Sequence, residues 1–136
     1  MKPTVDLDDD DGPRIVRSWP QMFADALRGV KVALRGEINF YVHLFIAVIA
    51  GVAGGIVQLT DEQWCIYILC VTIVLTAELF NTAIERLARA VTREAHPEVR
   101  DALDIASGAV LIASLGAGTI GVLMIAWPFV AQMVRM

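Results

Sequence analysis

Two glutamates and an asparagine interrupt an apolar stretch in the middle of the chain. Glu78, Asn81 and Glu85 follow fourteen residues, from Trp64 to Ala77, that carry no charge. At about 100° per residue, an α-helix places these three side chains and Arg89 on one narrow face. Carboxylate and amide oxygens are the ligands that a hard cation such as Mg²⁺ prefers. A carboxylate at an apolar boundary can also act as a general base toward a hydroxyl group.

This set of Glu78, Asn81, Glu85 and Arg89, the polar stripe, has more than one interpretation. Its members can simply be solvated, or paired with one another, as Glu85 is spaced to pair with Arg89 one turn on. Pairing suits Glu85 but not Glu78. Glu78 lies at least one helical turn further into the apolar stretch, and if that stretch crosses a membrane, a carboxylate at that depth costs roughly a few kcal/mol. The residues therefore favour a functional stripe, serving either a metal-assisted reaction at the membrane face or a path for cations or protons.

Long apolar segments must position this stripe. The chain has 136 residues, of which 57% are hydrophobic, and its mean hydropathy is +0.61. Soluble domains are usually about 45–50% apolar. Charge-free blocks run over Phe40–Leu59, Trp64–Ala77 and Ile105–Val134, and the second continues helically to about Val91. Since about 20 apolar residues span a bilayer, we expect an all-α integral membrane protein with three transmembrane helices.

The residues before the first span predict a surface helix over 18–36. Ser18 and Gln21 are spaced as a capping box, and apolar residues recur on one face beside a basic flank. Such a helix lies in a membrane interface, although packing on a partner explains the pattern nearly as well. Residues 1–13 are acidic, unlike a signal peptide, and are expected to be a disordered tail. Residues 14–136 are then one membrane-embedded domain.

The distribution of lysine and arginine predicts the orientation of the spans. These residues gather before the first span and after the second, and the 58–63 connection has none. The positive-inside rule places the N-terminus and the 92–103 connection in the cytoplasm, and the C-terminus outside. Glu37 precedes the first span and Asp104 is expected to open the third helix, so both acids could converge with the polar stripe.

Small residues predict close helix contacts. Gly51 and Gly55 are four apart in the first span, as are Ser114 and Gly118, and Ala117 and Gly121, in the third. This spacing lets helices approach closely in lipid, and three spans make a thin bundle, so a homo-oligomer is plausible. The sequence has no glycine-rich phosphate loop, so any nucleotide site must be built in another way.

Several motifs together resemble the prokaryotic diacylglycerol kinase family, which includes undecaprenol kinases. They are "ExxNTAIE" in the second span, "HP" after it, "D-x-A-[AS]-G-A-V" at the start of the third, "ExNF" followed by His43, and "LRGV" at 27–30. The resemblance covers roughly residues 17–125 and depends on the order and spacing of all these motifs. It implies a homotrimer that transfers the γ-phosphate of ATP to a lipid hydroxyl at the cytoplasmic face of a bacterial inner membrane. No nucleic-acid partner is expected.

The resemblance also implies a role for individual residues. Glu78 matches the family's catalytic base, and Glu37 and Glu85 match its Mg²⁺ ligands. The positions that match nucleotide-binding residues are Arg17, Asn81, Glu94, His96 and Asp104. Phosphoryl transfer depends mostly on positioning and on neutralising charge, so carboxylates holding Mg²⁺ beside a base make chemical sense.

Two positions depart from the family pattern. Arg89 stands where the family has an aspartate, and Leu103 replaces a lysine expected to contact the nucleotide phosphates. Arg89 or Arg100 could supply the missing positive charge. The expected function is an ATP- and Mg²⁺-dependent lipid kinase of the diacylglycerol kinase type, with undecaprenol as the main alternative acceptor. A catalytically impaired membrane scaffold or lipid sensor is the alternative from another class. A small transporter is disfavoured, because the acids cluster at one membrane face.

Overall fold

The chain is divided into two units, each described by itself. The computed structural model describes residues 4–6, 14–16, 18–35, 38–92 and 96–134. The first unit covers residues 1–35 and the second residues 36–136. In the first unit, strands β1 (Thr4–Asp6) and β2 (Arg14–Val16) pair antiparallel, with Val5 opposite Ile15. Residues 1–3 and 7–13 of the tail expected to be disordered lie outside the described part, and the disorder of that tail stays a prediction.

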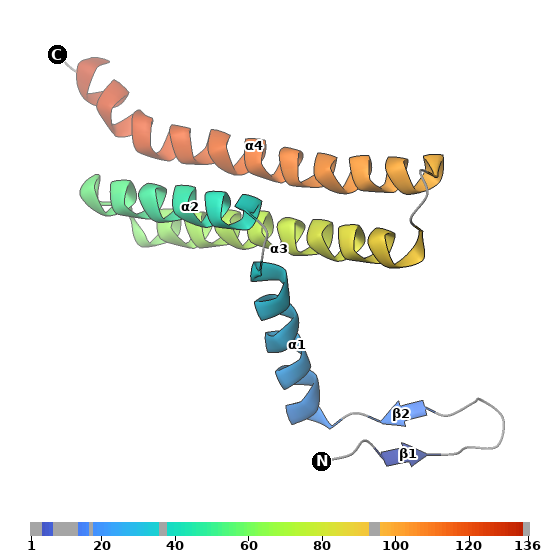
Figure 1. Cartoon of the computed structure of the whole chain (residues 1–136). Coiled ribbons are helices and arrows are strands. Elements are labelled where there is room, and N and C mark those ends of the chain that lie inside the picture. The colour runs from blue at the N-terminus through green and yellow to red at the C-terminus, as the bar shows by residue number, and fades with distance from the viewer. Residues whose placement is uncertain (1–3, 7–13, 17, 36–37, 93–95, 135–136) are drawn as a thin grey trace. The chain divides into compact units, whose positions relative to one another are not determined.

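Helix α1 (Trp19–Leu34) begins where the sequence predicts (Figure 1). The backbone N–H of Ser18 donates to Oε1 of Gln21 at 3.0 Å, as in a capping box. Trp19 and Phe23 are 84% and 70% exposed. A helix lying in a membrane interface or against a partner presents such an apolar face, so the choice between these two surroundings stays a prediction.

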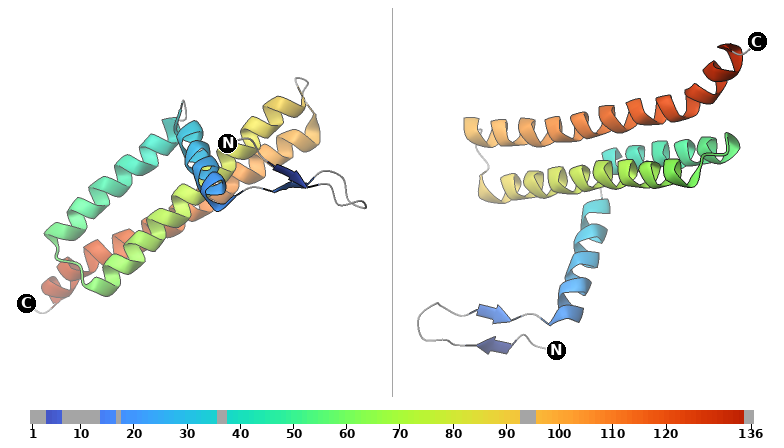
Figure 2. Two further views of the ribbon diagram at one scale, coloured as in Figure 1. Left: turned by 90° about the horizontal axis from the view of Figure 1, so that it is seen from below. Right: turned by 180° about the vertical axis from the view of Figure 1, so that it is seen from behind.

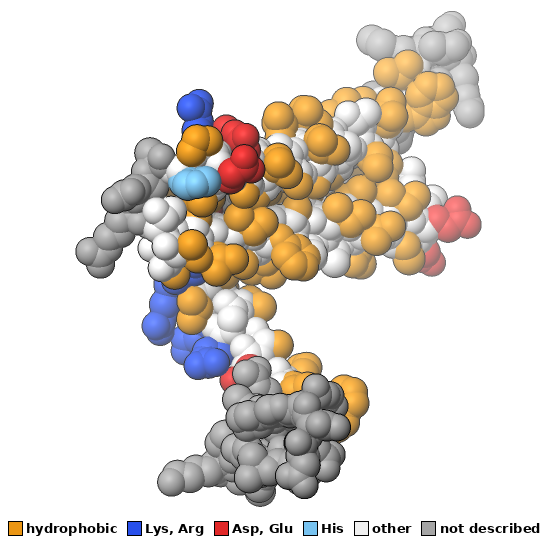
Figure 3. Space-filling view, turned by 90° about the vertical axis from the view of Figure 1, so that its right-hand side faces the viewer, with side chains coloured by type: hydrophobic (Ala, Val, Ile, Leu, Met, Phe, Trp, Pro, Cys, Tyr) orange, Lys and Arg blue, Asp and Glu red, His pale blue; other side chains and the backbone are white. Residues whose placement is uncertain are grey.

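Three long helices form the second unit: α2 (Ile38–Ile56), α3 (Asp61–Val91) and α4 (Pro97–Val134). Helices α3 and α4 pack side by side along most of their length, and α2 lies against α3 and contacts α4 least (Figures 1 and 2). Apolar side chains cover much of the visible surface in Figure 3, with charged side chains toward its margins. Each of the three helices is long and apolar enough to cross a membrane, which confirms the prediction of three helices of spanning length.

Helix α3 begins three residues before the expected apolar block. The N–H of Thr60 donates to Oε1 of Gln63 at 2.9 Å, and the N–H of Gln63 donates to Oγ1 of Thr60 at 3.3 Å. This reciprocal pair is a second capping box, which satisfies two backbone donors at the helix start. Polarity alone places these residues in the 58–63 connection, whereas their capping chemistry starts the helix there.

The prediction that Asp104 opens the third helix is wrong. Helix α4 begins at Pro97, and the carbonyl of His96 accepts a hydrogen bond from the N–H of Arg100 at 3.1 Å. Proline is favoured in the first turn, where its missing N–H has no helical partner in any case, and Glu98 there interacts favourably with the helix dipole. The connection is therefore much shorter than 92–103, and Asp104 lies about two turns inside the helix.

The predicted close helix contact is confirmed at Gly51. The hydroxyl of Tyr67 on α3 donates to the carbonyl oxygen of Ala47 on α2 at 2.6 Å. A Cβ atom at Gly51 would lie 2.8 Å from that hydroxyl oxygen, so glycine allows the tyrosine to reach across. A Cβ at Gly118 or Gly121 would meet no atom within 4 Å, because α4 barely touches α2. Among the described residues, the predicted contacts of these two glycines are not found.

We expect Gly51→Ala to lower the midpoint of thermal unfolding in detergent micelles, because the added methyl group displaces the Tyr67 hydroxyl. Interhelical hydrogen bonds in membrane proteins are worth about 0.6 kcal/mol on average and up to about 1.7. Gly55→Ala is the matched control, since a Cβ at Gly55 meets nothing within 4 Å. In a Tyr67→Phe background the Gly51→Ala effect should shrink; an undiminished effect there would contradict this account.

Candidate active site

Polar side chains are the most deeply buried ones in the described part of the helical unit. Glu78 and Thr82 are each 2% exposed and Asn81 is 6% exposed. Most of the large apolar side chains face outward instead. Lipid tails are as apolar as leucine, so a bilayer gives apolar side chains little reason to turn inward, whereas polar ones avoid it. Glu78 is therefore buried inside the bundle, and its depth in the membrane stays a prediction.

The polar stripe runs from the interior of the bundle to its surface. The amide Nδ2 of Asn81 donates to Oε1 of Glu85 at 3.0 Å, and Nη1 of Arg89 lies 3.6 Å from Oε2 of Glu85. The side chains of Glu85 and Arg89 are 28% and 60% exposed. The shared face and the pairing of Glu85 with Arg89 are thus confirmed, and the stripe connects buried Glu78 with the protein surface.

Thr82 belongs to this buried group although the sequence analysis missed it. It lies one turn after Glu78 on the same face of α3, and it is as deeply buried. An uncharged threonine inside an apolar helix attracts no attention by composition. Its spacing of four residues from Glu78 is the signal that could have found it.

The side-chain oxygen of Asn81 is a buried acceptor that lacks a hydrogen-bond partner among the described residues. Because the amide nitrogen donates to Glu85, Oδ1 must point elsewhere. Leaving a buried acceptor unsatisfied costs about 1–3 kcal/mol, and such exceptions in a native structure call for a reason. This oxygen belongs to the amide that contacts the Glu85 carboxylate, and it suits a hydrogen-bond donor or a hard cation.

His96 and Asp104, two other residues predicted to bind nucleotide, are far more exposed than Asn81. His96 is exposed and its backbone carbonyl begins α4. Nε of Arg100 lies 3.9 Å from Oδ2 of Asp104, and these side chains are 83% and 73% exposed. Leu103 is half-buried and its carbonyl accepts a hydrogen bond from the Ser107 hydroxyl at 3.0 Å. Charge near the start of α4 therefore faces outward, where a water-soluble ligand can reach it.

Three predicted site residues, Arg17, Glu37 and Glu94, lie outside the described residues. The described residues by themselves contain no group of three or more His, Cys, Asp or Glu side chains able to hold a metal. The predicted set of Glu37 and Glu85 is not tested by that observation, because one of its two ligands is not described. The magnesium site stays a prediction.

Comparison with known proteins decides the family to which these features belong. Residues 24–125 match the family model described as prokaryotic diacylglycerol kinase. The chain belongs to this family. It is similar to an undecaprenol kinase of Bacillus subtilis, with 31% identity over 118 residues, which cover 87% of this chain and 96% of that protein. It is also similar to a diacylglycerol kinase of Synechocystis sp., with 30% identity over 113 residues, which cover 82% of this chain and 65% of that protein.

Membership of the prokaryotic diacylglycerol kinase family confirms the resemblance found in the sequence. It supports lipid kinase activity at the level of the family.

Substituting Asn81 tests whether its oxygen faces a cation. We expect Asn81→Asp to lower the midpoint of thermal unfolding without Mg²⁺, because a carboxylate then faces Glu85. Adding Mg²⁺ should restore stability, by roughly 2.7 kcal/mol when its concentration is a hundred times the dissociation constant.

Asn81→Leu serves as the matched variant, since it has a similar size and offers no oxygen. Its midpoint should respond to Mg²⁺ less than that of the wild type. Equal responses in the wild type and both variants would show that Asn81 does not face a metal ion.

Proposed function

We propose that the protein transfers the γ-phosphoryl group of ATP to the hydroxyl group of a membrane lipid, in a reaction that requires Mg²⁺. The observation that carries this proposal is the burial of the Glu78 carboxylate at the inner end of the polar stripe. A general base must lie within reach of the hydroxyl that it deprotonates, and the hydroxyl of a membrane lipid stays at the membrane boundary. The stripe joins that boundary to the surface, where ATP arrives.

In this mechanism Glu78 accepts the proton of the lipid hydroxyl. The lipid oxygen forms a bond to the γ-phosphorus of ATP, while the bond from that phosphorus to the bridging oxygen breaks and ADP leaves. Little further covalent chemistry is needed, so the remaining residues position the reactants and balance their charge. Arg17, Asn81, Glu94, His96 and Asp104 are proposed to contact the nucleotide.

Glu85 and Glu37 are proposed to hold Mg²⁺, with Oδ1 of Asn81 as a further oxygen donor. The donor chemistry fits, because hard divalent cations take carboxylate and amide oxygens and the Asn81 oxygen lacks another partner among the described residues. When bound, Mg²⁺ would neutralise charge on the phosphates. Arg89 lies against the same carboxylate of Glu85 and must share it or move.

The proposed setting is the cytoplasmic membrane of a bacterium, with the N-terminus in the cytoplasm and the C-terminus outside. Three spans put the two termini on opposite sides, and the lysine and arginine distribution selects this orientation. We also propose a homotrimer. The open small residues of α4, such as Gly118, are compatible with contacts between chains.

The acceptor is proposed to be diacylglycerol, in keeping with the family description. Undecaprenol is the competing acceptor, because the undecaprenol kinase of Bacillus subtilis is matched over 96% of its own length by this chain. Both lipids offer an alcohol at the membrane boundary, so the chemistry at Glu78 is the same for either.

A catalytically impaired scaffold or lipid sensor is a second candidate, favoured by the contact between Arg89 and Glu85. An arginine on a proposed metal ligand competes with the metal, and Leu103 offers no charge to a phosphate. This candidate predicts that the protein binds lipid but not Mg²⁺ and ATP together.

We expect Glu78→Gln to abolish lipid phosphorylation while Mg²⁺–ATP binding remains close to that of the wild type. Glutamine keeps the size of the side chain and removes the base, whose help is typically worth about 10²–10⁴ in rate. The matched control is Glu62→Gln, an exposed position in the first turn of α3. Turnover by Glu78→Gln comparable with that of the control would remove Glu78 from the mechanism.

A double-mutant cycle of Arg89→Ala and Leu103→Lys tests whether Arg89 replaces the missing lysine. A charge-assisted hydrogen bond to phosphate is worth roughly 1.5–3 kcal/mol, or about tenfold to a hundredfold in ATP affinity. If Arg89 contacts the phosphates, Arg89→Ala should be severe alone and mild when combined with Leu103→Lys. Independent, additive effects on the KM for ATP would show that Arg89 is no substitute.

A further inference from the structure

Glu85 has a partner from its own helix on each of its two carboxylate oxygens. Nδ2 of Asn81 donates to Oε1 at 3.0 Å, and Nη1 of Arg89 lies 3.6 Å from Oε2. Asn81 precedes Glu85 by one turn of α3 and Arg89 follows it by one turn, so the two partners reach the carboxylate from opposite directions. The carboxylate proposed to hold Mg²⁺ is therefore already occupied by side chains of the protein.

The two partners differ in how easily they can leave. Asn81 is 6% exposed inside the bundle, whereas the side chain of Arg89 is 60% exposed. The distance of 3.6 Å is longer than an N–H···O hydrogen bond, so the contact of Arg89 is an ion pair without a hydrogen bond. An exposed ion pair shifts an equilibrium constant by at most about fivefold. Arg89 can therefore leave Glu85 at little cost, while Asn81 stays in place.

The pair of Arg89 and Glu85 also differs from other ion pairs between described residues. The side chain of Glu85 is 28% exposed, whereas the carboxylate partners in the other pairs, Asp25 and Asp104, are 40% and 73% exposed. A cation acts on a more enclosed carboxylate through less water, so their interaction is screened less. Arg89 therefore opposes a second cation at Glu85 more than a fully solvated arginine would.

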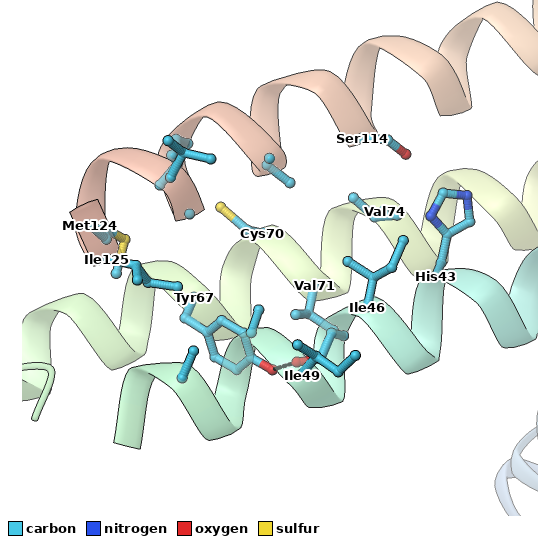
Figure 4. Close-up of a pocket in the computed structure, with 18 of the residues that line it drawn as sticks. His43, Ile46, Ile49, Tyr67, Cys70, Val71, Val74, Ser114, Met124 and Ile125 are labelled. Carbon is cyan, nitrogen blue, oxygen red and sulfur yellow. Dashed lines mark hydrogen bonds between the residues drawn. The ribbon is translucent and has the colours of Figure 1, made fainter. Parts of the chain in front are cut away.

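Charged ligands find their partners at this surface end of the polar stripe. A cavity of about 660 Å³ lies between α2, α3 and α4, but no Asp, Glu, Lys or Arg among the described residues lines it (Figure 4). A metal ion and a nucleotide phosphate each need an opposite charge. Glu85 and Arg89 offer both charges side by side, and the cavity offers neither.

The phosphates of ATP compete with Glu85 for the guanidinium of Arg89. The planar guanidinium matches a carboxylate and a phosphate equally well in shape. The phosphates of ATP carry several negative charges, however, and Glu85 carries one. Once Arg89 turns to a phosphate, Oε2 of Glu85 is left without the cation that opposes a metal ion.

We propose that Arg89 is a positioning residue with two positions, on Glu85 when the nucleotide site is empty and on a nucleotide phosphate when ATP is bound. This inference rests on the proposed lipid kinase function and adds how the metal site is controlled. The nucleotide opens Glu85 to the metal ion, whether that ion arrives with the nucleotide or after it. By thermodynamic linkage, nucleotide and metal each raise the affinity for the other by the same factor.

Binding of Mn²⁺ without turnover tests this switch. Mn²⁺ takes the same oxygen ligands as Mg²⁺, and the free ion can be measured by electron paramagnetic resonance. The full-length protein in phosphatidylcholine bilayers would be titrated without nucleotide and with saturating β,γ-imido-ATP, an analogue that is not hydrolysed. Mn²⁺ bound by the free analogue is subtracted.

Arg89→Gln should raise the affinity for Mn²⁺ without nucleotide by about fivefold or more. The lost ion pair accounts for up to about fivefold, and a positive charge beside the metal ion is removed as well. The analogue should then raise the Mn²⁺ affinity of the variant by a factor at least about fivefold smaller than in the wild type, because Glu85 is already open.

Two further variants provide the controls. Arg28→Gln removes another exposed arginine from an ion pair, with Asp25 at 3.2 Å, and should change neither Mn²⁺ affinity. Arg89→Lys keeps the positive charge, so it should retain weak Mn²⁺ binding without nucleotide and most of the gain from the analogue. A variant with lysine that behaves like Arg89→Gln would show that charge is not what closes Glu85, and would overturn the inference.

The remaining outcomes separate the switch from the proposed function. Equal Mn²⁺ affinities of the wild type and Arg89→Gln without nucleotide would overturn the switch. It would also be overturned if Arg89→Gln binds Mn²⁺ more tightly and still gains as much from the analogue as the wild type, because Arg89 would then only compete with the metal ion. Either result leaves the kinase proposal standing if the wild type phosphorylates lipid. The expected Mn²⁺ results without phosphorylation of any lipid would contradict the kinase proposal and leave the switch standing.

Discussion

The structure depends on keeping the Glu78 carboxylate inside a helix bundle that is itself surrounded by lipid. An acidic side chain at the centre of a membrane helix costs about 2.5–3.5 kcal/mol on insertion scales, so it must face the bundle interior and find polar neighbours. Asn81, Thr82 and Glu85 supply such neighbours within two turns of the same helix. The close packing of α3 against α4 helps to keep this group of polar side chains away from lipid.

Regular features of the site could be predicted from the sequence, because they depend on helical spacing. Four residues at intervals of three and four necessarily share a face, and the pair between Glu85 and Arg89 followed from that spacing. The three spans followed from uninterrupted apolar length. The start of α4 did not follow from apolar length, because its first two turns carry charged residues. Hydropathy alone assigns such residues to a connection, although Pro97 and Glu98 favour a helix start.

Features that depend on distances between helices could not be predicted. Glycine and alanine at intervals of four either bring two helices together or leave a gap between them. The same spacing of small residues occurs in both cases, so it does not distinguish a contact from a gap. Gly51 meets Tyr67, whereas Gly121 meets open space beside the cavity. The orphaned oxygens of Asn81 and Ser114 likewise depend on side-chain orientation in the folded bundle. The proposed metal contact is assigned to one of these irregular positions, Asn81.

The most direct test of the central claim is transfer of phosphate to lipid by the purified protein. The protein would be placed in phosphatidylcholine bilayers with γ-labelled ATP, Mg²⁺ and either diacylglycerol or undecaprenol. The account predicts that label appears on the lipid alcohol only when Mg²⁺ is present, and the faster acceptor identifies the substrate. Binding of Mg²⁺ and ATP with label found on neither lipid would contradict the claim that the buried Glu78 serves a lipid kinase.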